Sequence, residues 1–178
     1  MPGTERIFVD AQWLEFMDEE HKWSLFSRSR ATTDYRENTN LFTGAYINYT
    51  TRTGIGGTVV GRISSQGAGS DAGLHLFKAS GKGMIYALAS LGLSKDLSYS
   101  WFSIMRYTPA LSEKWDLYAS LELFSNFDKV GHVASVQRMR MGVSRKGVQF
   151  GLALNLSGLG QNYENRDSNP GIFIRKQF

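Results

Sequence analysis

The segment VQFGLALNLS, residues 148–157, alternates between apolar and polar positions. Successive side chains of a β-strand point to opposite faces, so this pattern predicts a strand with one apolar face. The apolar positions on that face are Val148, Phe150, Leu152, Leu154 and Leu156. A face of this kind contacts either a protein core or lipid, and the function depends on which of the two it is.

Similar strand-like segments recur along the whole chain. Clusters of Gly, Asn, Asp, Ser and Lys separate them, and these residues favour turns. Tight turns between consecutive strands predict an all-β, up-and-down antiparallel barrel. The expected strands are 6–16, 23–35, 40–51, 55–64, 73–79, 84–93, 97–107, 114–126, 132–144, 147–157 and 171–178.

The first 22 residues admit more than one interpretation. Residues 10–26 are also compatible with a helix, and 1–22 form either an extra strand or an N-terminal segment. Single-chain bacterial membrane barrels have an even number of strands. We therefore expect a transmembrane barrel of ten strands, without 6–16 in the wall, and twelve strands are the alternative. The long connections 126–131, 64–72 and 158–170 are expected at one end, opposite the tight turns TRTG, SGKG and SRKG.

Composition agrees with a single domain over residues 1–178. The chain is 42% hydrophobic and 20% charged, has 19 Gly and only three Pro, and contains no Cys. No run of 18 apolar residues predicts a transmembrane helix. The net charge is +4, but no Lys/Arg run marks a nucleic-acid surface, so no nucleic-acid partner is expected. The opening MPGTERIF lacks a signal-peptide pattern and leaves the compartment open.

The polar faces of the predicted strands favour a membrane barrel. A soluble barrel would carry many Lys and Glu on its outward face, whereas here Lys clusters at turns and the polar faces hold small residues and Arg. In a closed barrel these charges would line a lumen. The candidate lumen and solute-binding residues are Arg28, Arg30, Arg62, Arg106, Arg138, Arg140, Arg175, Asp34, Asp116 and Glu122.

Seven Arg against three acids would leave a positive excess in that lumen. Such an excess attracts anions, whereas an internal ion-pair network that fills a small barrel is the structural alternative. Aromatic residues near the predicted strand ends suit an interfacial girdle, although aromatics are also common at the ends of any strand. These are Trp23, Tyr35, Tyr49, Tyr107 and Trp115.

The C-terminal GIFIRKQF resembles the closing strand of bacterial outer-membrane β-barrel proteins, which end in an aromatic residue preceded by alternating apolar positions. Ile172, Ile174 and Phe178 fit that pattern, whereas Lys176 stands where an apolar residue is usual, and Pro170 is expected to mark the limit of the strand. The resemblance covers residues 23–178 in general pattern. It implies a Gram-negative outer-membrane location and insertion by the barrel assembly machinery.

No motif for catalysis or for a cofactor is evident. His21 lies beside Asp18, Glu19 and Glu20, where a solvated acidic turn is favoured over a cation site, and His75 and His132 have no spacing to Ser typical of lipid hydrolases. Residues 54–57, GIGG, belong to a hairpin and do not precede a helix, so they do not form a nucleotide loop. We expect no enzyme, no metal and no cofactor.

The sequence thus predicts a small, monomeric, non-enzymatic outer-membrane barrel. Its partners would be membrane lipid and a small, anionic or amphiphilic solute, held in a narrow channel or pocket, and a purely structural barrel is also compatible. Reversing Arg138 and Arg140 to Glu would shift conductance toward cations. The alternatives are a soluble lipocalin-like barrel that binds an apolar ligand and an outer-membrane lipid hydrolase.

Overall fold

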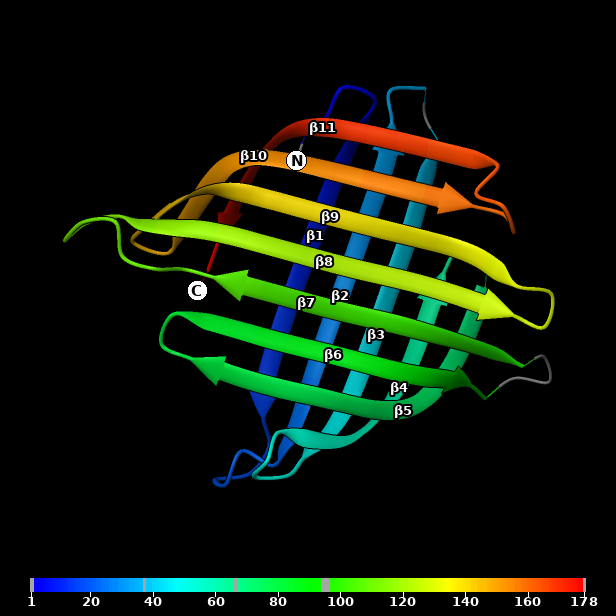
Figure 1. Ribbon diagram of the computed structural model, residues 1–178, viewed down its shortest axis with the longest axis horizontal. Helices are drawn as coiled ribbons and strands as arrows, with labels where there is room; N and C mark the ends of the chain where they lie inside the picture. The colour runs from blue at the N-terminus through cyan, green and yellow to red at the C-terminus, as the bar shows by residue number, and fades with distance from the viewer. Residues whose placement is uncertain (1, 37, 66, 94–96, 178) are drawn as a thin grey trace.

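The protein is built almost entirely of β-strands. A computed structural model describes residues 2–36, 38–65, 67–93 and 97–177. Its strands form a single antiparallel sheet in which each strand pairs with the next one along the chain (Figure 1). The strands are β1 (Arg6–Phe16), β2 (Trp23–Asp34), β3 (Thr39–Thr50), β4 (Ile55–Ser64), β5 (Gly67–Ser80), β6 (Gly83–Gly92), β7 (Ser98–Tyr107), β8 (Asp116–Asp128), β9 (His132–Arg145), β10 (Val148–Leu159) and β11 (Asn165–Lys176).

The up-and-down antiparallel order is confirmed, but the expected count of ten strands is wrong because β1 is part of the wall. It pairs with β2 along its whole length, from Arg6 opposite Asp34 to Phe16 opposite Ser24. The helical interpretation of residues 10–26 is wrong for the same reason. Apolar side chains alternate with polar ones in β1, and that period of two suits a strand and not a helix.

The sheet curls into a barrel that is nearly closed. In Figure 1, β1–β3 cross behind β6–β10, so the two halves of the sheet face each other across an interior. The edge strands β1 and β11 are not joined by a continuous ladder. Residues 2–4 bridge the gap instead, through a pairing of Gly3 with Gly171 and a hydrogen bond of 3.0 Å from Thr4 N to Pro170 O.

This seam depends on glycine, because the two backbones approach closely. A Cβ atom added to Gly171 would lie 2.4 Å from the carbonyl oxygen of Pro2, and one added to Gly3 would lie 2.2 Å from Asn169 Oδ1. Pro170 does not limit the strand as expected, since β11 begins five residues earlier and Pro170 lies opposite Leu154. A strand at the edge of a sheet tolerates proline because its outer N–H positions need no ladder partner.

The connections do not separate into long ones at one end and short ones at the other. The expected loop 158–170 is wrong, because only residues 160–164 lie between β10 and β11. The expected loop 64–72 is also wrong, because β5 begins at Gly67. The connection 108–115 is longer than either and lies at the same end as the tight turns 51–54, 81–82 and 146–147. This end also holds the end of β11, and we call it the C-terminal end.

The apolar faces of the strands point outward. On β10, Phe150 and Leu152 are exposed, whereas Gln149 before them and Ala153 after them are buried. On β11, Ile172 and Ile174 are likewise exposed. Phe178, the last residue of the resemblance, lies outside the described residues. A soluble barrel, in contrast, exposes few large apolar side chains on its outer wall.

The interior holds apolar and polar groups side by side. One apolar cluster consists of Tyr46, Val60, Leu88, Phe102 and Ile104, and a second one joins Tyr118, Ala153 and Phe173. Buried polar side chains occupy the remaining inward positions, among them Arg28 and Glu122. The inward face of the sheet thus encloses charged groups that must find partners within the barrel.

Candidate functional site: the charged interior

The centre of the interior is an ion-pair network built on Arg28. This side chain projects from β2 and is 1% exposed. Its Nε and Nη2 atoms donate to the two carboxylate oxygens of Asp10, on the neighbouring β1, at 2.8 and 2.5 Å. Nη2 also donates to Glu122 Oε2 at 2.7 Å. Because Glu122 lies on β8, far from β2 in the order of strands, this contact crosses the interior of the barrel.

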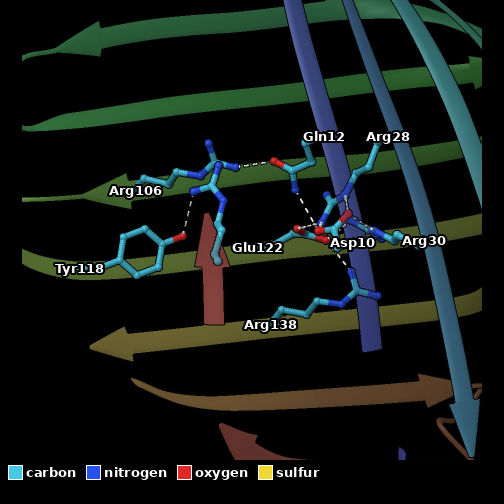
Figure 2. A network of polar contacts seen from close by, with 9 residues as sticks. Asp10, Gln12, Arg28, Arg30, Arg106, Tyr118, Glu122 and Arg138 are labelled. Atoms are coloured by element: carbon cyan, nitrogen blue, oxygen red, sulfur yellow. Dashed lines mark hydrogen bonds and ion pairs between the residues drawn. The ribbon is translucent and has the colours of Figure 1, made fainter. Parts of the chain in front are cut away.

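Glu122 also accepts hydrogen bonds from two further guanidinium groups. Arg30 of β2 and Arg138 of β9 both donate to its Oε1 atom (Figure 2). One buried carboxylate therefore accepts from three arginines, and a buried charge is stable only when it is paired and hydrogen-bonded in this way. Figure 2 shows these side chains converging on Glu122 from strands on both sides of the interior.

A chain of hydrogen bonds extends this network toward β7. Gln12 Nε2 donates to Asp10 Oδ2 at 2.9 Å, and Gln12 Oε1 accepts from Arg106 Nη2 at 2.6 Å. Figure 2 shows Gln12 between Asp10 and Arg106. Arg106 is thus held by a neutral amide and not by a carboxylate.

A second arginine lies close to Arg106 with neutral partners as well. Arg175 of β11 donates to Gln149 Oε1 at 3.1 Å and to the Tyr118 hydroxyl at 3.5 Å. Arg106 and Arg175 are near enough for their charges to repel each other. In the part of the chain that the structure describes, neither forms an ion pair, so two positive charges are only partly compensated here.

The two remaining candidate arginines, Arg62 and Arg140, have other partners. Arg62 of β4 forms a separate pair with Asp71 of β5, with 2.7 Å between Nε and Oδ2. Arg140 of β9 lies over the ring of Phe8, 5.8 Å from its centroid, and Arg138 lies over the same ring at 4.8 Å. Phe8 is buried, so its π face contributes to holding positive charge inside the barrel.

Two of the candidate acids belong to other places and need correction. Asp34 accepts hydrogen bonds from the backbone N–H groups of Arg36 and Asn38, both at 2.9 Å, and so stabilises the β2–β3 turn. Asp116 is exposed at the start of β8. Among the described residues, neither forms an ion pair with an interior arginine. Asp34 instead bonds to the nearest backbone donors, as short acids at strand ends often do.

Asp10 and Asp71 supply negative charge to the interior instead, and neither is among the candidates from the sequence. The excess of seven arginines over three acids therefore stands, with different acids. Asp10 follows the alternation of β1, where Phe8, Asp10 and Gln12 share the inward face, and it would have been found had β1 been included in the wall. Asp71 falls in the segment 64–72, whose Gly and Ser residues predict a loop, so the sequence assigns it to neither face of a strand.

The three histidines make no metal cluster. Within the described ranges, no group of three or more His, Cys, Asp or Glu side chains is arranged to hold a metal ion. Asp18 accepts from the backbone N–H groups of Lys22 and Trp23 and so stabilises the turn beside His21. His75 is buried between two threonine hydroxyls, with 2.7 Å from Nδ1 to Thr58 and 2.9 Å from Nε2 to Thr50.

Comparison with known proteins adds no relative. No family model matches the chain, and no curated protein matches it either. Over the described residues, no helix is long and apolar enough to cross a membrane.

Proposed function

We propose that this chain is a membrane-spanning β-barrel of the Gram-negative outer membrane whose interior binds, or conducts through a narrow path, small anionic solutes. The observation that carries the proposal is the distribution of side chains, with many large apolar residues on the outer wall and a surplus of arginine inside. Lipid is the solvent that favours such an exterior. The strands pair with their neighbours along the sheet, and residues 2–4 bridge part of the seam between β1 and β11, which lowers the number of unpaired backbone groups that lipid would meet.

Exposed aromatic residues near the ends of strands support the membrane position. Trp23 and Tyr49 contact each other with ring centroids 4.9 Å apart at the C-terminal end, and Tyr107 is exposed at the same end. Tyr35 is exposed at the opposite end. Rings with polar tips are enriched at both surfaces of a bilayer.

The choice of an anionic solute rests on buried hydrogen-bond donors that have no acceptor within the protein. Among the described residues, the buried atoms Arg28 Nη1, Arg30 Nε and Arg138 Nε have no hydrogen-bond partner. Arg106 and Arg175 add two charges that are held only by neutral groups. A small anion would supply acceptors and negative charge to such donors.

The role of the interior is passive in this proposal. The ion pairs from Arg28 to Glu122 cross the barrel, so the interior admits small solutes only, and the protein acts as a monomer without a cofactor. A soluble barrel that binds an apolar ligand is the weaker candidate, because the apolar faces point outward.

The first test is whether the protein folds only with a lipid or detergent surface. We expect the protein refolded in detergent to migrate differently on SDS gels before and after boiling, as a closed or nearly closed barrel resists the detergent when cold. A folded monomer in plain buffer would contradict the membrane position.

Ion selectivity in planar bilayers tests the interior. The Arg106→Gln/Arg175→Gln double variant removes the two arginines held by neutral groups and leaves the pairs to Glu122 in place. We expect the reversal potential in a salt gradient to shift toward cation selectivity. Arg52→Gln, at an exposed arginine in the β3–β4 turn, is the matched control and should not shift it. Equal selectivity in all three proteins would refute an anion-attracting interior.

Replacing Arg106 and Arg175 is a sharper test than reversing Arg138 and Arg140. Arg138 donates to Glu122, so a Glu at this position would place two carboxylates against each other. Loss of conductance in that variant would report misfolding and not selectivity.

A further inference from the structure

A serine and a histidine form a hydrogen-bonded pair on the outer wall, away from the charged interior. His132, the first residue of β9, has Nε2 2.7 Å from Ser135 Oγ and Nδ1 2.8 Å from the carbonyl oxygen of Gly160. A carbonyl oxygen only accepts, so the Nδ1 atom carries the proton. Nε2 then has a free lone pair, and it accepts the hydrogen bond from the Ser135 hydroxyl.

This tautomer is the one that activates a serine. A hydroxyl becomes a nucleophile when a neighbouring imidazole can take its proton and a third group orients the ring. Here Nε2 is the base and the Gly160 carbonyl is the orienting group. The sequence analysis found no such spacing, because the three groups come from the start of β9, its fourth residue and the β10–β11 turn.

Neighbouring groups hold the imidazole in place. His132 is buried, its ring lies 4.1 Å from the ring of Tyr163 in a stacked arrangement, and it meets Phe127 edge-on at 5.5 Å. On the adjacent strand β8, Ser125 Oγ lies 2.8 Å from Ser135 Oγ. Since the Ser135 proton is given to His132, Ser125 donates in this contact and leaves the histidine bond intact.

The serine opens to a groove on the outer surface. A cavity of about 330 Å³ is lined by Ser135, Gln137, Leu156 and Tyr163, together with residues 166–168. Gln137 lies two residues after Ser135 and therefore on the same face of β9, where its amide can donate to a developing oxyanion. Ser135 is partly exposed, so a substrate in this groove can reach it.

The surroundings indicate what kind of substrate fits. Exposed aromatic side chains lie at the same end of the barrel as the groove. Tyr163, in the β10–β11 turn, lines it, and Tyr99 and Trp101 lie on β7, two strands from Ser135. Aromatic belts of this kind lie at the level of lipid headgroups. Carboxylic ester bonds of lipids lie at the same level, between the headgroup and the acyl chain.

We propose that Ser135 and His132 hydrolyse the carboxylic ester of an acylated lipid at the outer wall of the barrel. This activity goes beyond the passive role of the interior. The choice of a lipid ester rests on the proposed membrane position, whereas the activated serine rests only on the contacts described above.

The reaction balances with water as the co-reactant. Ser135 Oγ attacks the carbonyl carbon as its proton moves to His132 Nε2, and the tetrahedral adduct collapses when Nε2 returns that proton to the departing alkoxide. Water then attacks the acyl-serine and gives a proton to Nε2. The bond from Oγ to the acyl carbon breaks, Oγ regains the proton from Nε2, and the free acid leaves.

A fluorophosphonate probe tests the activated serine on the protein folded in detergent. We expect covalent labelling, assigned to Ser135 by mass spectrometry, no labelling of Ser135→Ala, and a labelling rate at least about 100-fold lower for His132→Asn. Ser100→Ala is the matched control, because Ser90 and Ser100 form the same kind of cross-strand pair, 2.9 Å apart. It should label at the wild-type rate.

The shift on unboiled gels shows that each variant is folded. Folded wild type that is not labelled, labelling at another residue, or an unchanged rate in His132→Asn would each overturn the proposal. Failure of the membrane position is distinguishable, because it would appear as a soluble folded monomer whether or not Ser135 is labelled.

Phospholipid vesicles containing the protein test the substrate class. We expect release of fatty acid that is lost in Ser135→Ala and retained in Ser100→Ala. Hydrolysis of short soluble esters alone, with intact phospholipid, would overturn the assignment to lipid.

Discussion

Replacing Glu122 with Gln is the most direct test of how the interior is held together. The substitution keeps the size of the side chain and an acceptor oxygen but removes the only negative charge that Arg30 and Arg138 contact directly through short hydrogen bonds. Arg28 would keep Asp10 as its partner. The expected result is a marked loss of unfolding free energy, because Arg138 loses its counter-charge and Arg30 keeps only the more distant Asp10, with 3.7 Å between Nε and Oδ1.

The magnitude follows from the burial of the network. The Glu122 side chain is 5% exposed, and those of Arg30 and Arg138 are 15% and 11% exposed. Two unit charges 4 Å apart attract by about 4 kcal/mol at an effective dielectric constant of 20, and desolvation offsets much of this attraction. Removing one partner of a buried pair typically costs about 3–5 kcal/mol, and we expect a loss in that range.

Urea-induced unfolding of the protein inserted in vesicles measures this loss. Asp116→Asn is the control, since Asp116 is exposed and its change should stay within about 0.5 kcal/mol of wild type. Adding Arg138→Gln to Glu122→Gln should restore part of the stability, because one uncompensated cation disappears with it. A Glu122→Gln variant as stable as Asp116→Asn would show that the network is hydrated or otherwise compensated, and the reasoning would fail.

Three further changes test the outer wall and the seam. Leu152→Arg places a charge on the outward apolar face and should destabilise the protein in vesicles by about 2–4 kcal/mol if that residue lies near the bilayer centre. Val130→Arg, in the exposed β8–β9 turn, should change the unfolding free energy by less than about 0.5 kcal/mol. Gly171→Ala should lower it by about 1–3 kcal/mol, because the added Cβ meets a backbone oxygen, whereas Gly81→Ala has open space and should be nearly neutral.

The strands were predictable because each carries its own local signal. Alternation of side chains and turn residues between runs require no knowledge of the rest of the fold, and all eleven segments found in this way are strands. The ends were less accurate. β5 begins at Gly67 and not at residue 73, since small residues such as Gly69 and Ser70 carry little alternation, although their backbone pairs normally with β4.

The expected number of strands is wrong because it follows the even-number rule of bacterial membrane barrels, whereas the local pattern of β1 already indicates a wall strand. Ile7, Val9 and Trp13 alternate with Phe8, Asp10 and Gln12 as clearly as the residues of β10 do. Excluding β1 in order to reach an even number also removed Asp10 from the list of interior charges. The error in the site was therefore a consequence of the error in the fold.

The partners of the interior arginines could not be derived from the sequence. Which acid reaches Arg28 depends on which strands face each other across the barrel, and that depends on the curl of the whole sheet and not on spacing along the chain. Glu122 is buried in the interior, where its three arginine partners come from β2 and β9. The pair of Ser135 and His132 could not be derived for a related reason. The carbonyl group that orients His132 belongs to Gly160, in the β10–β11 turn, and the sequence predicts only a long loop there.

Strand β9 contributes residues to both proposed sites, because its alternate side chains point to opposite faces of the sheet. Arg138 and Arg140 point into the charged interior, whereas Ser135 and Gln137 line the outer groove. A shift of one residue in the register would exchange the two sets, placing guanidinium groups on the outer wall and the serine against the ion pairs. The register is held on one side by Glu122 opposite Arg138 and on the other by Ser125 opposite Ser135, both from β8. The contacts that position the interior charges and those that position the serine therefore stabilise the same alignment of two strands.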